Sequence, residues 1–567
     1  MSTSSDMLAL QRLYHWEKTA PHRVCFTQPV GQGAVKNFTW SEVAHEVRCM
    51  ASYLQSLGHP PGSRIAIWGK NTAHWIMADW AIWMAGHVSV PLYPTLAIKT
   101  VRQILTHSGA CLMFVGKLDD YEAMSAGMPE HLHCINLPLG SPSSSSQWDD
   151  IVRLQFPLQG SILRPAEDLC TVMYTSGTTG NPKGVMHSFG TFQAIIAQGL
   201  ERIPLNESDR MLSYLPLSHI AERGLVEHML LATGMHVFFA ESQETFARDM
   251  QRARPTFFFS VPRLWLKFRE GVHAKMPPHK LARLLKIPLL NRLVQKKILT
   301  ALGLDQCRVA AGGAAPMPAE LMCWYATLGL NLIELYGMTE NGCTHSTDVN
   351  SPLPGSVGQV LNGVKCRLDP ESSEVQVLSQ GLMLGYFQEP ELTAQTFTSD
   401  GWLHTGDKGS LDAQGNLKIT GRVKDLFKTS KGKYVAPAAI EALLSVMPGV
   451  EACCVVGANL AQPLAIVAMT PELIQQSLDA QGRNQLTAIF QRELANLNQQ
   501  LDPHERLSCL VMDSSPWTVA SGFVTPTLKV KRNQIEEVYG TLFDAWTAHG
   551  SDIVWLLDLG SNQRSKD

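Results

Sequence analysis

The segment 169–188, LCTVMYTSGTTGNPKGVMHS, holds the densest group of side chains suited to chemistry. An apolar strand is expected to end at Tyr174, and seven of the next eleven residues are Gly, Ser or Thr, with Lys183 and Gly184 closing the run. Glycines let backbone N–H groups turn toward an anion, hydroxyl groups add donors, and the lysine adds positive charge. The segment therefore predicts a polyphosphate-binding loop. Its expected binding residues are Thr175, Ser176, Gly177, Thr178, Thr179, Gly180 and Lys183.

The spacing of this loop excludes two other common nucleotide-binding loops. A Walker loop requires Gly-Lys followed by Ser or Thr, whereas here Pro182 precedes Lys183 and Gly184 follows it. The dinucleotide fingerprint GxGxxG is absent as well. A flexible Gly/Ser linker is the remaining alternative, but such linkers rarely follow a buried strand directly and close on Pro-Lys-Gly. The polyphosphate interpretation is therefore favoured.

A second segment, LYGMTEN (335–341), places a hydroxyl group beside a carboxylate after a predicted strand. Thr339 can donate a hydrogen bond to a phosphate, and Glu340 offers a hard oxygen ligand that suits Mg²⁺. A lone glutamate after a strand is more often an ordinary surface residue. The phosphate loop in the same chain favours the catalytic and metal-binding interpretation of Thr339 and Glu340.

The loop YTSGTTGNPKG resembles the phosphate-loop signature of adenylate-forming enzymes, which include acyl-CoA synthetases, luciferases and the adenylation domains of peptide synthetases. Five further segments resemble this family in the same order and cover nearly the whole chain. LYGMTEN is similar to the family's Tyr-Gly-x-Thr-Glu segment, and AAGGAAP (310–316) is similar to the segment against which the family lays adenine. The residues that these two segments add to the expected nucleotide site are Gly313, Ala314, Tyr336 and Gly337.

The resemblance continues after residue 400. GWLHTGD (401–407) is similar to the segment whose aspartate accepts hydrogen bonds from the ribose hydroxyls, which implies this role for Asp407. GRVKD (421–425) follows, and the resemblance places Arg422 near ribose or phosphate and Lys424 at a hinge between two domains. As isolated residues these would be ordinary solvated charges, so their assignment depends on the ordered series of motifs.

The segment TPTLKVKR (525–532) resembles the family's C-terminal segment that carries the catalytic lysine. Aligning Lys-x-x-Arg selects Lys529, with Arg532 closing the motif and Lys531 as the alternative. The family's usual Ser-Gly-Lys is replaced here by Thr527-Leu528-Lys529. This departure concerns the detailed shape of the loop more than the role of the lysine.

Three segments are similar to those of long-chain fatty acid acyl-CoA synthetases. SYLPLSHIAER (213–223) implies that His219 lies by the acyl site, and SVPRLWLKF (260–268) implies that Trp265 borders a fatty-acid tunnel, although a lone tryptophan is more often plain core. KTSKGKYVAP (428–437) is the third such segment. The resemblance thus implies ATP, Mg²⁺ and coenzyme A as reactants or cofactors. It leaves open a smaller or aryl acid, an acyl-AMP ligase delivering to a carrier-protein thiol, and a nucleotide-binding regulator without catalysis.

Short β-rich segments alternate with amphipathic helical patterns, which predicts an α/β fold with mostly parallel sheets. The expected strands are 64–69, 88–94, 111–116, 256–261, 307–313 and 331–337, and a helix is expected over 41–58. After residue 400 closely spaced glycines precede a new α/β pattern. We therefore predict a large N-terminal AMP- and acyl-binding domain over 1–423 and a small, mobile α+β domain over 424–567 that carries the catalytic lysine.

Composition favours an ordinary globular enzyme of several packed units, with 567 residues, 45% apolar and 17% charged residues. A net charge of −3 gives no reason to expect nucleic acid as a partner. The 12 cysteines form no CxxC pair or Cys/His cluster, and no signal peptide or spanning segment is evident, so a cytoplasmic setting is expected. Peripheral contact with the inner face of a membrane is left open.

Overall fold

A computed structural model gives the structure of the chain and describes residues 7–125, 128–129, 132–141, 146–176, 182–519, 521–525 and 528–556. The chain divides into two compact units. The first unit comprises Met1–Ala314, Met322–Arg367 and Gln376–His404, and the second comprises Ala315–Leu321, Leu368–Val375 and Thr405–Asp567. The predicted domain boundary after residue 423 lies within the second unit and stays a prediction.

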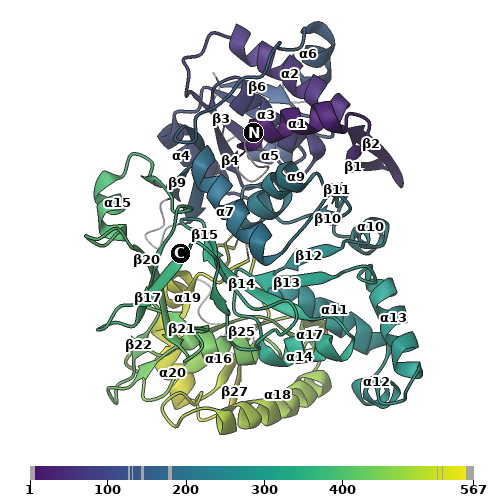
Figure 1. Ribbon diagram of the computed structural model, residues 1–567. Coiled ribbons are helices and arrows are strands. Elements are labelled where there is room, and N and C mark those ends of the chain that lie inside the picture. The colour runs from purple at the N-terminus through teal and green to yellow at the C-terminus, as the bar shows by residue number, and fades with distance from the viewer. Residues whose placement is uncertain are drawn as a thin grey trace. The chain divides into compact units, whose positions relative to one another are not determined.

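The largest sheet of the first unit has, among the described residues, eight strands in the order β19-β9-β8-β4-β3-β5-β6-β7 (Figure 1). They are β3 (Arg64–Trp68), β4 (Val88–Leu92), β5 (Leu112–Val115), β6 (His133–Asn136), β7 (Ser146–Gln147), β8 (Leu169–Ser176), β9 (Pro182–Ser188) and β19 (Gly385–Tyr386). The strands from β8 to β7 pair in parallel, whereas β9 and β19 pair antiparallel. Ile65 and Ile67 of β3 pack into one core, and Ala66 and Trp68 into another. Both faces are therefore buried, as in parallel sheets of α/β proteins.

Helices cover both faces of this sheet. They are α2 (Trp40–Ser56), α3 (Ala73–Met84), α4 (Ile98–Ser108), α5 (Tyr121–Ser125) and α6 (Trp148–Leu154). The helix predicted over 41–58 is confirmed as α2, which begins at a capping box where the Glu42 N–H donates to Thr39 Oγ1 and the Thr39 N–H donates to the Glu42 carboxylate. Helix α3 is apolar apart from His74 and Asp79, and it is buried along its whole length.

A second sheet of the first unit has the order β12-β13-β14-β15-β16. Its strands are β12 (Phe257–Ser260), β13 (Val309–Gly313), β14 (Leu332–Met338), β15 (Gly342–Ser346) and β16 (Gln359–Val360). The first three pair in parallel, as predicted for these segments, and the last two pair antiparallel. The helices that follow or precede them are α10 (Phe246–Ala253), α11 (Pro262–Lys275), α12 (Pro278–Leu285), α13 (Leu290–Leu302), α14 (Ala319–Thr327) and α15 (Pro390–Thr396).

A third sheet of the first unit has the order β10-β11-β1-β2. Its strands are β1 (Val24–Gly31), β2 (Ala34–Thr39), β10 (Arg210–Ser213) and β11 (His236–Phe239). The helical segments nearby are α1 (Ala9–Thr19), α7 (Phe189–Arg202), α8 (Ile220–Glu222), the π-helix η2 (Arg223–His228) and α9 (Met229–Thr233). Helix α7 packs against β9, β15 and η2, so it links the first two sheets to the segment around His219.

A further sheet has the order β17-β18-β20-β21. Its strands are β17 (Lys365–Leu368), β18 (Glu374–Leu378), β20 (Leu403–Leu411) and β21 (Leu417–Arg422). A two-stranded hairpin follows, formed by β22 (Phe427–Lys428) and β23 (Tyr434–Val435).

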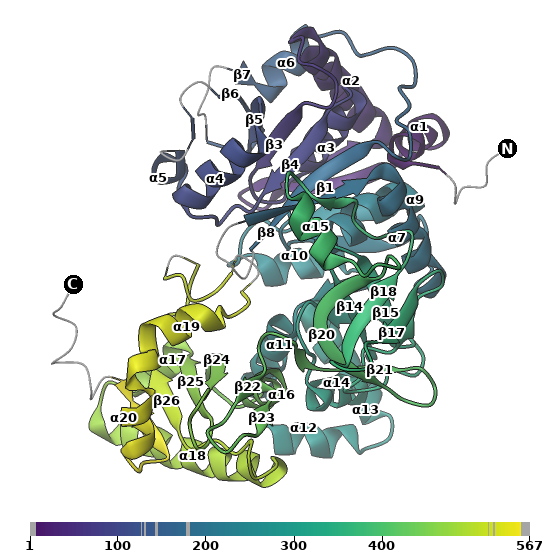
Figure 2. The same ribbon diagram turned by 90° about the vertical axis from the view of Figure 1, so that its left-hand side faces the viewer.

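The second unit ends in a sheet of order β24-β25-β26-β27. Its strands are β24 (Val450–Val456), β25 (Leu464–Met469), β26 (Leu510–Asp513) and β27 (Ile553–Trp555). The surrounding helices are α16 (Pro437–Leu444), α17 (Pro471–Gln476), α18 (Ala480–Gln500), α19 (Arg532–Tyr539), η3 (Gly540–Leu542) and α20 (Phe543–Ala548) (Figure 2). Alternate residues of β25 enter two cores, one shared with α16 and α18 and the other with α19 and α20. This small α/β unit carries the predicted catalytic lysine.

Candidate active site

The hairpin of β8 and β9 positions the two ends of the predicted phosphate loop. Strand β8 runs two residues past Tyr174, its expected end, because Thr175 pairs with Lys183 and Ser176 with Pro182 across the hairpin. Thr175 and Ser176 are therefore strand residues at the base of the loop. The predicted binding residues Gly177, Thr178, Thr179 and Gly180 lie outside the residues that the structure describes.

Lys183 and Glu340 are brought together through Tyr386. The Lys183 ammonium lies 5.4 Å from the centroid of the Tyr386 ring, a cation–π contact. The Tyr386 hydroxyl donates to Glu340 Oε1 at 2.8 Å, and both side chains are buried. Burial and the neighbouring carboxylate raise the pKa of Tyr386, so the phenol keeps its proton and remains a donor. Sequence reasoning missed Tyr386, because only the pairing of β19 with β9 brings it here.

Thr339 is held by a buried histidine of β9. Burial lowers the pKa of His187 to about 4, so the ring is neutral, and its Nε2–H donates to the Thr339 carbonyl at 2.7 Å. The other ring nitrogen, Nδ1, contacts Thr191 Oγ1 at 3.0 Å. The strand that carries Lys183 thus also fixes the backbone beside Glu340.

Glycine is required where β14 turns into β15. A Cβ atom on Gly337 would lie 1.8 Å from the Gly342 carbonyl oxygen, so no other residue fits there. The two predicted adenine-site segments are adjacent in space, because Gly313 at the end of β13 pairs with Leu335 of β14. Ala314 follows with a positive φ of 64°, and Tyr336 contacts His345 edge-on with ring centroids 5.6 Å apart. The two strand ends therefore bring together the residues expected to contact adenine.

His219 lies at the start of α8, where its Nδ1 accepts a hydrogen bond from the Ala221 N–H at 3.2 Å. Glu222, which follows within the same motif, is buried and accepts from the Ser213 hydroxyl at 2.8 Å and from the Tyr214 N–H at 2.9 Å. Burial raises the pKa of Glu222 to about 8. These hydrogen bonds to Glu222 therefore hold the loop that precedes His219 against the end of strand β10.

Arg223, the last residue of that motif, forms a buried polar network that sequence reasoning did not predict. It pairs with Asp79 of α3 and with Glu227 one turn ahead, and it donates to Thr171 Oγ1 of β8 at 2.7 Å and to Ser89 Oγ of β4 at 2.9 Å. All the charged side chains of this network are fully buried. The network attaches the π-helix η2, and with it the His219 segment, to the sheet that bears the phosphate loop.

Trp265 lies in the core of the first unit, with no exposed surface. Its indole N–H donates to the Ala311 carbonyl of β13 at 3.2 Å, and the Tyr325 hydroxyl donates to the Trp265 carbonyl at 2.7 Å. The ring thus supports the strand that ends at Gly313. Its predicted role at a fatty-acid tunnel stays a prediction.

A small apolar cavity of about 30 Å³ lies between α7, η2 and the second sheet. Leu225, Met229, Phe257, Leu335 and Cys343 are among its lining residues. Strands β14 and β15 supply Leu335 and Cys343, and these two strands flank Thr339 and Glu340 in the chain. A cavity of this volume has room for little more than a water-sized group.

In the second unit, Asp407 and Arg422 are cross-strand partners on β20 and β21. Arg422 Nε lies 3.0 Å from Asp407 Oδ1, with the guanidinium half-exposed and the carboxylate mostly buried. Lys424 is exposed two residues further on. The paired strands thus bring together the two residues that the resemblance assigns to ribose and phosphate.

Lys529 belongs to the second unit, is exposed, and directly precedes Val530, which forms an antiparallel bridge with Val524. The Thr525 N–H donates to the Lys529 carbonyl at 2.8 Å, and the Lys529 N–H donates to Thr525 Oγ1 at 3.1 Å. Leu528 adopts a positive φ of 60°, at the position where the family's usual motif has glycine. The loop thus keeps the glycine-like backbone although the glycine has been replaced.

Arg532 anchors this loop. Its guanidinium donates to the Val455 carbonyl of β24 and pairs with Glu441 Oε1 of α16 at 2.7 Å. Burial alone lowers the pKa of Arg532, but the nearby Cys454 and Glu441 raise it above its ordinary value. Arg532 is therefore a permanently charged structural anchor for the lysine loop.

A family model described as AMP-binding enzyme matches residues 13–387, and one described as the AMP-binding enzyme C-terminal domain matches residues 424–547. The first covers well over half of the chain. The chain belongs to the AMP-binding enzyme family. The predicted resemblance to adenylate-forming enzymes is thereby confirmed, and so is the α/β fold class.

Several proteins that are similar to this chain have names that fit this family. The AMP-binding enzyme is 28% identical to long chain acyl-CoA synthetase 4 of Arabidopsis thaliana, over 89% of this chain and 86% of that protein. It is 27% identical to long-chain-fatty-acid–CoA ligase FadD15 of Mycobacterium bovis, over 94% and 96%. Its fold is similar to the adenylation domain of a carboxylate reductase from Mycobacterium chelonae, with a TM-score of 0.79, 20% identity and coverage of 96% and 92%.

The described residues of this AMP-binding enzyme contain no group of three or more His, Cys, Asp or Glu side chains arranged for a metal ion. The oxygen donor Glu340 nevertheless fits Mg²⁺, because Mg²⁺ in nucleotide enzymes is commonly held by one or two carboxylates, substrate phosphates and water. All twelve cysteines are free.

Proposed function

We propose that this AMP-binding enzyme is an ATP-dependent acyl-CoA synthetase that acts on a long-chain fatty acid. The observation that carries the proposal is the grouping of Lys183, Tyr386 and Glu340 in a chain that the AMP-binding enzyme model matches over residues 13–387. The names of the similar curated proteins, which act on long-chain acids, support the same substrate class.

In the first half-reaction a carboxylate oxygen of the acid attacks the α-phosphorus of ATP. An oxygen–phosphorus bond forms, the bond to the bridging oxygen breaks, and pyrophosphate leaves. The reaction brings anions together, so preorganised positive charge and hydrogen-bond donors lower its barrier. Lys183, at the base of the phosphate loop, and Lys529 are assigned to supply charge, and Thr339 is assigned to donate to the α-phosphate.

Glu340 is proposed as the protein ligand of Mg²⁺, which when bound would offset phosphate charge. Glu340 Oε1 accepts a hydrogen bond from the Tyr386 hydroxyl, and this bond fixes the orientation of the carboxylate. His187 fixes the preceding backbone through the Thr339 carbonyl. These contacts hold the carboxylate in one orientation at little entropic cost when substrate binds.

In the second half-reaction the sulfur of coenzyme A attacks the acyl carbon. A carbon–sulfur bond forms, the carbon–oxygen bond to AMP breaks, and the thiol proton is lost to the medium. AMP leaves readily because the mixed anhydride makes it a far better leaving group than oxide. The half-buried His219, beside the acyl site by resemblance, and the Asp407–Arg422 pair, expected at the ribose, complete the assigned machinery.

An acid panel tests the proposed function. Purified enzyme is assayed for ATP–pyrophosphate exchange and for CoA-dependent AMP release with long-chain, short-chain and aryl acids. The expected result is exchange that depends on a long-chain acid and AMP release that depends on CoA. Turnover confined to short or aryl acids contradicts the long-chain assignment. Exchange without CoA-dependent release indicates a carrier-protein acceptor, and the absence of exchange with every acid indicates a non-catalytic protein.

The predicted tunnel role of Trp265 is tested by Trp265→Ala. The relative kcat/KM across chain lengths should change, by a few kcal/mol at most for a methylene-sized difference. Loss of a buried tryptophan also costs about 3–5 kcal/mol of stability. A variant that only loses stability, with an unchanged chain-length profile, returns Trp265 to the core.

A further inference from the structure

The helices α12 and α13 form what we term the basic hairpin, residues 275–302. No Asp or Glu occurs between Glu270 and Asp305, although the whole chain has a net charge of −3. The hairpin carries only positive charges. Its seven Lys and Arg residues are Lys275, Lys280, Arg283, Lys286, Arg292, Lys296 and Lys297.

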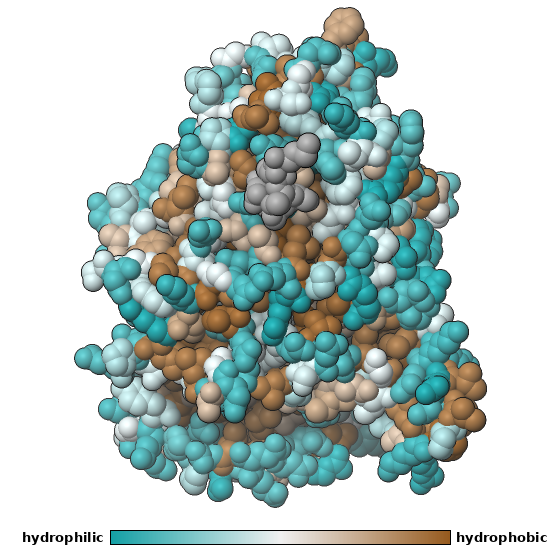
Figure 3. Space-filling view, viewed as in Figure 1, coloured by the Kyte–Doolittle hydropathy of each residue, from teal (hydrophilic) through white to brown (hydrophobic). Residues whose placement is uncertain are grey.

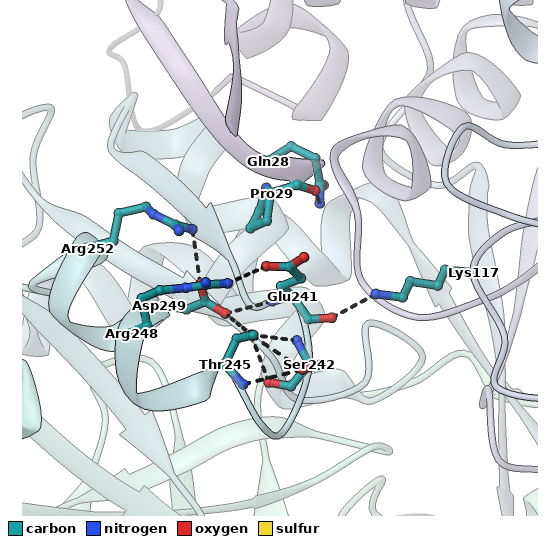
Figure 4. A network of polar contacts seen from close by, with 9 residues as sticks. All are labelled: Gln28, Pro29, Lys117, Glu241, Ser242, Thr245, Arg248, Asp249 and Arg252. Carbon is teal, nitrogen blue, oxygen red and sulfur yellow. Dashed lines mark hydrogen bonds and ion pairs between the residues drawn. The ribbon is translucent and has the colours of Figure 1, made fainter. Parts of the chain in front are cut away.

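The seven cations of the basic hairpin are all exposed, and none forms an ion pair within the described part of the chain. The neighbouring helix α10 shows the usual arrangement for comparison (Figure 4). There Arg248 pairs with Glu241 at 2.7 Å, and Arg252 pairs with Asp249 at 3.0 Å. The hairpin therefore presents uncompensated positive charge, whereas the adjoining surface is neutralised internally.

Apolar side chains protrude among these cations. Leu289 is 78% exposed, Leu293 66% and Ile287 47%, while Leu281 and Ile298 turn inward and are buried. Figure 3 shows hydrophobic residues among hydrophilic ones at its lower right, over α12 and α13. Large apolar side chains exposed together on one surface commonly mark a site of interaction with a partner or a membrane.

The most exposed of these leucines also has a strained backbone. Leu289 follows Pro288 with φ 68° and ψ −43°, a conformation that side chains other than glycine rarely adopt. Glycine at this turn would fit without strain. An exposed, strained leucine therefore indicates that the side chain is retained for something other than folding.

We propose that the basic hairpin docks this protein onto an anionic lipid bilayer. Ile287, Leu289 and Leu293 enter the boundary between head groups and acyl chains, while the surrounding cations contact lipid phosphates and carboxylates. This combination of a cationic face with a few large apolar residues is typical of helices that lie in the membrane interface. The described residues contain no helix with the length and apolarity to cross a bilayer, so the docking is peripheral.

Other occupants fit this surface less well. A second copy of the chain would bring seven cations against seven of the same sign, with no acid on the hairpin to offset them. Nucleic acid would accept the cations but has no apolar counterpart for Leu289 and Leu293. The exposed apolar residues Leu154 and Phe156 lack the uncompensated charge, because the adjacent Arg153 pairs with Asp150.

Vesicle flotation with the full-length enzyme, without substrates, tests the proposal independently of catalysis. The expected result is binding to vesicles of equimolar phosphatidylcholine and phosphatidylserine, little binding to phosphatidylcholine alone, and release by high salt. Lys286→Gln, Arg292→Gln and Lys296→Gln should each lower the partition coefficient roughly fivefold. Equal binding to neutral and anionic vesicles, or binding to RNA without binding to anionic vesicles, overturns it.

Two further variants separate docking from folding. Leu289→Gly relieves the backbone strain, so its melting temperature should be unchanged or higher, while its partition coefficient should fall about tenfold with loss of one inserted leucine. The control Leu154→Ser/Phe156→Ser removes two equally exposed apolar side chains elsewhere and should bind vesicles like the wild type. Loss of binding in this control, or full binding by Leu289→Gly/Leu293→Ser, contradicts docking through the hairpin.

Discussion

Lys529 is the residue on which the proposed chemistry depends most. Two hydrogen bonds join its backbone to Thr525, and the mostly buried Arg532 fixes the chain three residues later to Val455 and Glu441. The ammonium group is exposed. An exposed ammonium group next to an anchored segment can present charge to a substrate, as electrostatic stabilisation of a transition state requires.

Lys529→Ala tests this role. If the ammonium stabilises charge at the α-phosphate, adenylation should fall by about 100-fold or more, as for loss of a central electrostatic group. Thioester formation from supplied acyl-AMP should fall much less, because no phosphorus is attacked in that step. The two rates are measured by pyrophosphate exchange and by acyl-CoA formation. Lys531→Ala is the matched control, and a larger loss in that variant shows that the alignment selected the wrong lysine.

Leu528 gives a prediction about stability at the same loop. A leucine at φ 60° is strained by roughly 1 kcal/mol, and glycine removes that strain while adding entropy to the unfolded chain. Leu528→Gly should therefore leave the free energy of unfolding unchanged or raise it by up to about 1 kcal/mol. Urea denaturation measures it. Leu528→Ala, which keeps the unfavourable φ, should show no gain, and a stabilised Ala variant contradicts the strain explanation.

At the scale of elements, the loop from β10 to α8 is the segment whose position depends most on buried ionisable groups. Glu222 accepts hydrogen bonds from Ser213 and Tyr214 inside the first unit, and Arg223 connects α8 and η2 to the sheet. His219 lies between these two anchors. A change in either anchor should therefore reach His219, which is proposed to lie by the acyl site, without touching a substrate.

The raised pKa of Glu222 predicts how stability depends on pH. Its folded value of about 8 lies above its ordinary value of 4.5, so the unfolded chain loses this proton at lower pH than the folded chain. Glu222 thus lowers the free energy of unfolding as pH rises from about 5 to 8, by at most about 1.4 kcal/mol per pH unit. Glu222→Gln keeps an acceptor for Ser213, and its free energy of unfolding should lack this pH-dependent component.

Chemical denaturation of wild type and Glu222→Gln at several pH values gives the component as the difference between the two curves. Glu167→Gln, at an exposed glutamate, should follow the wild-type curve. A constant difference between wild type and Glu222→Gln from pH 5 to pH 8 would mean that Glu222 is already ionised in the fold.

The sequence was most informative about buried strands and least informative about long-range pairing. The strands 64–69, 111–116 and 256–261 were predicted because runs of apolar residues mark strands that are buried on both faces. The contact of Tyr386 with Glu340 was not predicted, because it depends on the register of β19 against β9. These two strands are more than 190 residues apart in the chain. The Arg223 network was missed for the same reason, because its partners come from α3, β4 and β8.

At the scale of the whole molecule, the predicted catalytic groups are divided between the two compact units. Lys183 and Glu340 belong to the first, and Asp407, Arg422 and Lys529 belong to the second. The C-terminal family model begins at residue 424, the residue that the resemblance assigns to the hinge. In the proposed mechanism adenylation needs Lys529 at the phosphates, whereas coenzyme A needs a path to the acyl carbon. We therefore expect the two half-reactions to require two arrangements of the chain.

Lys424→Pro tests this expectation. Proline locks φ near −65° and removes an N–H, but the Lys424 N–H makes no hydrogen bond within the described part of the chain, so the fold should survive. Only rotation at the hinge is restricted. One half-reaction should then remain nearly intact, with adenylation the expected survivor, while acyl-CoA formation from supplied acyl-AMP stalls. Lys424→Ala, which removes the charge but keeps φ free, should retain both. If both half-reactions fall together in folded Lys424→Pro, the chain pivots elsewhere.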